Sequence, residues 1–317
     1  MYTPRFNPNS AVSNWKARLD YLKGYPGAAM SGALNGGFFG AAPIEATGGT
    51  ITTYTSGSTN YKAHTFTGSG TFAVTFSPAD QVVDFLVIAG GGGVYPEDRA
   101  GGGGAGGYRE FTGVTITAGN YTATIGGGGS SASGSTSTLN QSSGSGWTNI
   151  SSTGGGYSGS WQRSAASGGS GGGGGGAYSA GGSGNAGGYS PVEGNSGGSS
   201  NGTWYNNSCG GGGSSYGGGG MNSNGVAGYA GGGDSNDFRT GTGELRGGGG
   251  GGQANWSQAQ ATSSYGGGTG NKFDVSGSPS TAGTANTGGG GGGGSSIPAG
   301  YGKAGGSGII IIRYEVA

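Results

Sequence analysis

Few side chains in this sequence are of the types that carry catalysis, and their spacing gives them little to work with. The chain has a single histidine, His64, which lies in a segment where apolar and polar residues alternate. It also has a single cysteine, Cys209, so a Cys–His nucleophile would have only His64 as its base. The pattern favours a structural histidine and a small buried thiol, with catalysis as the less favoured alternative.

The acidic residues offer a second possibility, because carboxylates bind hard cations and act in pairs during glycoside hydrolysis. Asp234, Asp237 and Glu244 lie close together in the sequence. Their spacing matches no calcium loop, so a solvated turn is the plainer interpretation. The other carboxylates are too scattered to nominate a catalytic pair. The many Gly-x-Gly-x-x-Gly matches follow from composition and not from a phosphate-binding turn. We predict no enzymatic activity, no metal and no cofactor.

Aromatic side chains set between glycine runs give the strongest binding signal. Large rigid rings with a polar edge bury contact area at little entropic cost, and they stack on sugar faces or receptor loops. The alternative is that these rings cap the glycine layers and bury themselves. The candidate receptor-binding residues are Trp161, Trp204, Tyr205, Phe238, Arg239 and Trp256.

The glycine content determines what must position these rings. Glycine supplies 90 of the 317 residues, and runs such as 171–176 and 288–294 break the three-residue period of collagen. A flexible spacer is the other alternative, but disordered tracts are rich in charge, and only 8% of this chain is charged. We therefore predict extended left-handed helices of three residues per turn that pack side by side and exchange backbone hydrogen bonds.

Charge and hydropathy exclude several classes of partner. The 13 basic and 13 acidic residues cancel, and no basic cluster marks a nucleic-acid surface, so no nucleic-acid partner is expected. No apolar run approaches the roughly 20 residues that span a bilayer. The start of the chain, Met1 to Arg5, lacks the layout of a signal peptide. We expect synthesis in a cytoplasm and no membrane insertion.

Residues 1–48 differ in composition from the rest of the chain. Ser10 is a typical helix cap, and the apolar residues after it fall on one helical stripe that Gly24 and Pro26 end. A helix of about three to four turns gains little stability alone, so the stripe must dock on its own fold, on sister subunits or on another protein. The stripe consists of Val12, Trp15, Leu19 and Leu22.

From Gly49 onward the pattern changes to two-residue alternation, which predicts β-strands. Residues 85–88 and 309–312 are apolar on both faces, so each should form a buried central strand. The predicted strands are 51–54, 61–67, 71–76 and 82–89, then a hairpin of 114–117 and 121–125 joined through Gly119 and Asn120, and finally 309–312.

The position of the last strand predicts the domain organisation. A buried terminal strand needs strand neighbours, and the nearest ones in the sequence lie before residue 127. The fold class is therefore mainly β: an antiparallel β-sandwich of residues 49–126 and 309–317, interrupted by residues 127–308. That insertion is the glycine-rich tip of polyglycine-II-type helices, and residues 1–48 add a short α-helix and an arm.

Four short stretches combine a strand with the glycine residues beside it. They are residues 64–67 with 70–72, 85–93 (FLVIAGGGG), 101–109 (GGGGAGGYR) and 305–314 (GGSGIIIIRY). Together they resemble the glycine-rich domains of tailed-bacteriophage virion proteins, especially those of cyanobacterial and marine phages. The resemblance covers roughly residues 49–317. It implies a tail-fibre, fibre-tip or capsid-attached protein, usually trimeric in fibres, with variable loops facing the bacterial surface.

The resemblance and the aromatic turns together give the leading functional hypothesis. It is a virion protein, assembled in the host cytoplasm, whose tip binds a bacterial surface glycan or outer-membrane protein. Residues 1–48 would anchor it, as a homotrimer, to other proteins of the tail or capsid. The alternative is a capsid decoration or connector protein without receptor binding. A surface-glycan depolymerase and an ice-binding protein rank below both.

Overall fold

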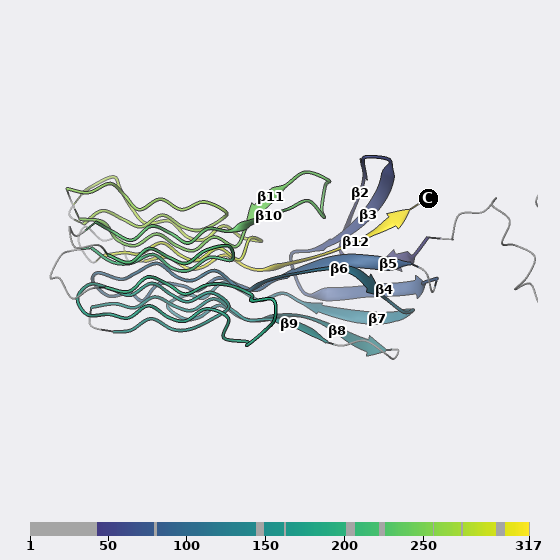
Figure 1. The fold of residues 1–317 in the computed structure, drawn as a ribbon, viewed down its shortest axis with the longest axis horizontal. Coiled ribbons are helices and arrows are strands. Elements are labelled where there is room, and N and C mark those ends of the chain that lie inside the picture. Colours follow the sequence, from purple (N-terminus) through teal and green to yellow (C-terminus); the bar gives the residue numbers. More distant parts are fainter. Residues whose placement is uncertain are drawn as a thin grey trace, which may run out of the picture. The chain divides into compact units, whose positions relative to one another are not determined.

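The computed structural model describes residues 43–316, except 79–80, 144–148, 162, 201–206, 222–225, 256, 274 and 296–301. The predicted N-terminal helix, with Val12, Trp15, Leu19 and Leu22, lies outside these residues. The described part combines β-strands with long glycine runs that lie side by side (Figure 1). Within it there is no helix with the length and apolarity needed to cross a membrane.

The strands form two antiparallel five-stranded sheets. The first sheet has the order β1 (Glu45–Thr47), β4 (Gly70–Phe76), β7 (Gly119–Thr124), β8 (Ser137–Ser143) and β9 (Ile150–Ser152). The second has the order β2 (Thr50–Ser56), β3 (Thr59–Phe66), β12 (Ile309–Val316), β5 (Val82–Ile88) and β6 (Tyr108–Thr115). The predicted antiparallel β-sandwich is confirmed.

The main hydrophobic core lies between these two sheets. Phe72, Tyr121 and Leu139 of the first sheet join one cluster with Phe85 and Ile310 of the second. All five side chains are buried. Fully burying one such side chain contributes on the order of 1.5–3 kcal/mol. The alternation of strand side chains therefore holds the sandwich together.

The second sheet is also covered on its other face, as the sequence of its central strands predicts. Ile309 and Ile311 of β12 pack there with Leu86 of β5 and with Phe238. Phe238 belongs to the hairpin of β10 (Asp234–Asn236) and β11 (Glu244–Arg246). The four isoleucines of β12 are therefore buried on both faces, which confirms the predicted central strand.

The predicted hairpin of 114–117 and 121–125 is wrong, because the two segments enter different sheets. β6 pairs with β5, whereas β7 pairs with β4 and β8. The connection crosses the sandwich at a tyrosine corner, in which the Tyr121 hydroxyl donates to the Thr117 carbonyl at 2.8 Å. Burial of the Tyr121 ring in the core and this bond send the chain to the opposite sheet.

Beyond the strands, the glycine runs form a hydrogen-bonded lattice (Figure 1). Residues 100–107 illustrate it, because every third amide donates to the same neighbouring run. Gly101 and Gly104 donate to the carbonyls of Gly159 and Gly156, at 3.0 and 2.9 Å. A three-residue repeat is the signature of the polyglycine-II-type helix. The predicted ordered packing of glycine helices is confirmed.

The same run has neighbours on all sides. Its amides donate to residues 153–159, 209–212 and 288–294. Its carbonyls accept from the amides of Ala89, Gly92, Ser170, Gly173 and Gly250. Side chains would prevent this close approach. A Cβ at Gly103, for example, would lie 2.1 Å from the Gly92 carbonyl oxygen. Glycine is therefore required here for packing.

The boundaries of the two parts differ from those expected. Strands β8 and β9 lie within residues 127–308 but complete the first sheet. Conversely, residues 89–94 and 100–107 lie before the expected tip yet occupy the lattice interior. The chain thus alternates between sheet and lattice, and both belong to one compact unit, Ala41–Ala317.

Candidate functional site

Three loops of the lattice meet at its end away from the sheets. Residues 89–94 lead out from β5 and residues 100–107 lead back into β6, so the loop 95–99 lies at that end. The Trp161 amide donates to the Asp98 carbonyl at 3.3 Å, which joins the turn 160–163 to this loop. We call Tyr95, Glu97, Asp98, Arg99, Trp161 and Arg163 the distal cluster.

Arg99 and Trp161 form the centre of the distal cluster. The Arg99 guanidinium lies over the indole ring, with Cζ 4.0 Å from the ring centroid. Arg99 has a φ of 55°, a left-handed conformation that L side chains rarely adopt. Its carbonyl accepts from the Gly176 amide at 3.0 Å, so the lattice holds this backbone in place. Trp161 itself is half-buried, with part of its surface left to solvent.

A second cation–ring pair stands beside the first. Arg163 Cζ lies 4.3 Å from the centroid of the Tyr95 ring, and Arg163 Nη1 lies 3.9 Å from Glu97 Oε1. Ser160 Oγ donates to the other oxygen of Glu97 at 2.5 Å. The hydrogen bond with Tyr95 raises the pKa of Arg163, so this group remains charged at any physiological pH.

A third loop adds an exposed ring next to these pairs. Ser179 Oγ donates to the Arg163 carbonyl, and Tyr178 beside it is 69% exposed. Tyr178 has a φ of 55°, so its backbone is also held in a left-handed conformation. The Ser179 hydroxyl accepts from the Gly175 amide at 2.9 Å, which fixes this turn to the lattice.

The chemistry of this surface is that of recognition. Two carboxylates and two guanidinium groups balance in charge, and they surround aromatic rings that are only partly covered. Planar rings with polar and charged edges provide contact area and hydrogen-bonding groups for a sugar or a protein loop. The ring, backbone and ion-pair contacts described above hold the loops to the lattice, so binding would cost little ordering entropy.

The six predicted receptor-binding residues are not brought together in the described structure. Trp161 lies in the distal cluster, whereas Trp204, Tyr205 and Trp256 lie outside the described residues. Phe238 and Arg239 belong to the β10–β11 hairpin at the sheets. The Phe238 ring is 3% exposed and packs on the second sheet. Arg239 forms an ion pair with Glu244 within the hairpin.

Sequence reasoning missed Tyr95, Arg99, Arg163 and Tyr178. A signal for the first two was present, since residues 95–99 (YPEDR) concentrate three charges between two glycine runs in a chain with few charges. The six candidates were all chosen after residue 160, so they did not include this loop. The pairing of Arg99 with Trp161 joins distant parts of the chain, so no local pattern reveals it.

His64 and Cys209, the side chains considered for nucleophilic catalysis, lie in different parts of the structure. His64 is buried between the sheets, where Nδ1 lies 2.7 Å from the Gly48 carbonyl oxygen and Nε2 lies 3.0 Å from the Tyr314 hydroxyl. Cys209 is buried in the lattice, and burial raises the pKa of its thiol to about 11. Both side chains have the surroundings expected of structural residues.

Asp234, Asp237 and Glu244, which were considered as a cation site, do not come together in the structure. Asp237 accepts from Arg313 at 3.0 Å, and Glu244 pairs with Arg239 and Arg246. Within the described residues, no group of three or more acidic, histidine or cysteine side chains is placed to hold a metal ion. The ion pairs of Asp237 and Glu244 indicate that these two carboxylates stabilise the hairpin.

Comparison with known families gives one match. Residues 65–315 match the model of a family described as a glycine-rich domain. This range contains most of both sheets and the whole described lattice. No curated protein and no solved structure matches the chain.

Proposed function

We propose that this chain, which belongs to the glycine-rich domain family, is a non-enzymatic virion protein of a tailed bacteriophage that binds the bacterial surface through the distal cluster. The virion assignment rests on the strand-to-glycine junctions described above, including residues 85–93 and 305–314. The binding assignment rests on one geometrical observation, the pairing of Arg99 with Trp161 on a hydrogen-bonded lattice.

The lattice supports this role because it supplies rigidity without side chains. Each interior run is bonded to several neighbours, so the loops at its end have little freedom to rearrange. A receptor-binding surface benefits from such preorganisation, since fewer groups must be ordered on contact. Sequence changes in the loops leave the glycine framework untouched, which suits a surface that must follow a changing receptor.

The remaining parts of the proposal concern attachment. Residues 1–48, with the apolar stripe of Val12, Trp15, Leu19 and Leu22, would dock on other proteins of the tail or capsid. The partner at the opposite end would be a bacterial surface glycan or outer-membrane protein. A homotrimer is the proposed assembly, because fibre proteins with such domains are usually trimeric.

The test is binding of the labelled full-length protein to a panel of cyanobacterial strains and to lipopolysaccharide isolated from them. We expect strain-dependent binding that Trp161→Ala reduces at least about tenfold, as for a residue at the centre of an interface. Tyr216→Ala is the matched control, because Tyr216 is 49% exposed but lies at the sheet-side end of the lattice, in a turn that Ser214 N joins to the carbonyl of Gly247, directly after β11. No binding to any strain, or equal loss in both variants, would leave the decoration or connector role instead.

A further inference from the structure

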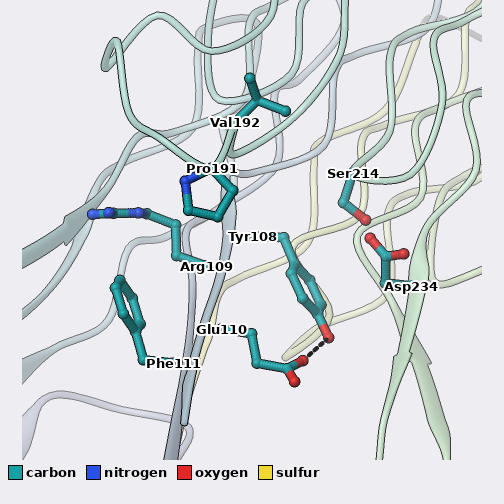
Figure 2. Close-up of a pocket in the computed structure, with 8 residues that line it drawn as sticks. All are labelled: Tyr108, Arg109, Glu110, Phe111, Pro191, Val192, Ser214 and Asp234. Carbon is teal, nitrogen blue, oxygen red and sulfur yellow. Dashed lines mark hydrogen bonds between the residues drawn. The ribbon is translucent and has the colours of Figure 1, made fainter. Parts of the chain in front are cut away.

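A second recognition feature lies where β6 enters the lattice. It is a pocket of about 180 Å³ between the start of β6, the turn at Pro191 and the hairpin strand β10 (Figure 2). Specific small-ligand pockets usually measure roughly 300–1,000 Å³, so this one suits a smaller group. The lining residues are Tyr108, Arg109, Glu110, Phe111, Pro191, Val192, Ser214 and Asp234.

The polar lining of this pocket is rich in unused acceptors. The Asp234 carboxylate has no hydrogen bond or ion pair with any other residue that the structure describes. Glu110 accepts only through Oε2, from the Tyr108 hydroxyl at 3.3 Å and from Asn236 Nδ2 at 3.0 Å. The Ser214 hydroxyl is buried and has no partner among the described residues. A ligand must therefore bring hydrogen-bond donors.

The rest of the lining is apolar or aromatic. Figure 2 shows Pro191 and Val192 above the Tyr108 ring, with the Tyr108 hydroxyl directed to Glu110. Val192 is 62% exposed, so it forms an accessible lip. Burial raises the pKa of Tyr108 far above its usual range, so this hydroxyl stays protonated and remains a donor to Glu110. The pocket thus combines an apolar wall with carboxylate acceptors.

Charge does not favour an ionic ligand here. Arg109 is held by the Ser151 carbonyl at 2.9 Å and lies over the Tyr189 ring, with Cζ 3.9 Å from its centroid. Arg246 stands opposite Asp234 in the β10–β11 ladder. The charged groups of the pocket and of the adjoining hairpin nearly cancel: Glu110, Asp234, Asp237 and Glu244 stand against Arg109, Arg239 and Arg246, and Asp237 is already paired with Arg313 of β12.

We propose that this pocket binds a single neutral monosaccharide unit. Its hydroxyls donate to Asp234 and to the free oxygen of Glu110, because hydrogen bonds to carboxylates are the stronger kind available to a neutral hydroxyl. Its apolar C–H face packs against the Tyr108 ring and the Pro191–Val192 lip. The site is separate from the distal cluster and does not depend on the role proposed for it.

Saturation-transfer NMR and calorimetry on the full-length protein test this proposal. The probes are the methyl glycosides of glucose, galactose, mannose and N-acetylglucosamine, with ethylamine as a cationic comparison. We expect at least one glycoside to bind and ethylamine to bind less well. Asp234→Asn keeps the side-chain volume but removes the charged acceptor, and it should weaken glycoside binding about tenfold or more.

Two further variants separate loss of the site from loss of fold. Val192→Trp places a large ring at an exposed lip, so it should block binding while leaving the thermal unfolding midpoint unchanged. Glu315→Gln, which removes an exposed carboxylate at the end of β12, should bind like the original protein. Trp161→Ala should also leave this binding intact. No glycoside binding, preferential ethylamine binding, or full binding by both pocket variants would overturn the proposal.

Discussion

The guanidinium of Arg99 lies over the indole ring of Trp161, with Cζ 4.0 Å from the ring centroid. This contact joins a loop that follows β5 to a turn that follows β9, and it stands where neighbouring lattice runs end. Neither of these two loops contains a β-strand among its described residues. The backbone bonds Trp161 N–Asp98 O and Gly176 N–Arg99 O fix both loops to the same framework.

Replacing Arg99 by glycine separates binding from stability. Glycine relieves the left-handed backbone at φ 55°, a gain of about 1 kcal/mol, and loses a cation–π contact of about 0.5–1 kcal/mol. We therefore expect the urea unfolding midpoint to change little. Binding to susceptible cells should nevertheless fall as it does in Trp161→Ala. A variant that binds normally would remove Arg99 from the proposed surface.

Gly103→Ala tests the close packing of the lattice. The new Cβ would lie 2.1 Å from the Gly92 carbonyl oxygen, which is backbone and cannot turn aside. We expect a loss of about 3 kcal/mol or more in the free energy of unfolding, seen as a lowered thermal midpoint. Gly127→Ala is the control, because a Cβ there meets nothing within 4 Å. Equal midpoints for the two variants would contradict the packing described.

Arg313 fastens the β10–β11 hairpin to the second sheet. It is paired with Asp84 at 3.0 Å and with Asp237 at 3.0 Å, and its side chain is 13% exposed. Arg313→Met leaves both carboxylates without this partner and should destabilise the protein by about 3 kcal/mol. Faster amide exchange over residues 234–246 should accompany the loss.

The control for this variant is Arg239→Met in the same hairpin. Arg239 is 43% exposed and pairs with Glu244, so its replacement should cost no more than about 1 kcal/mol. If the two replacements lower the free energy of unfolding by the same amount, Arg313 does not hold the hairpin to the sheet.

Acid should weaken the sandwich through His64. Burial lowers the pKa of this imidazole below 6.5, more than the hydrogen bond to the Gly48 carbonyl raises it. The folded state therefore binds fewer protons than the unfolded state, so stability falls as the pH drops below about 6.5. Urea midpoints at pH 7.5 and 5.5 measure the effect. In His64→Gln the difference between the two urea midpoints should be smaller. An unchanged difference would mean that other groups cause the loss of stability in acid.

The sequence predicted the parts of the fold that depend on local pattern. Continuous apolar character at Ile309–Ile312 indicated a strand buried on both faces, and the neutral glycine runs indicated packed left-handed helices. The path of the chain after β6 was not predictable in this way. A Gly119-Asn120 pair favours a local hairpin, but burial of Tyr121 and its bond to Thr117 depend on the assembled core.

The candidate site was predictable in kind but not in detail. Tryptophan between glycine runs correctly directed attention to Trp161 as a loop residue. The same reasoning cannot separate a ring that packs, such as Phe238, from one that lies in an end loop. Arg99 and Arg163 gain their positions only when three distant loops meet, and that meeting depends on the order in which the glycine runs pack.

The binding proposal requires that the lattice be ordered before any partner arrives, and amide hydrogen exchange of the isolated full-length protein measures this directly. We predict that the amides of residues 100–107 exchange about a thousandfold or more slowly than in an unstructured peptide, because their hydrogen bonds open only with the surrounding runs. The amide of Tyr178, whose side chain is 69% exposed, should exchange much faster. Exchange at the unstructured rate throughout residues 100–107 would contradict the lattice, and with it a preformed binding surface.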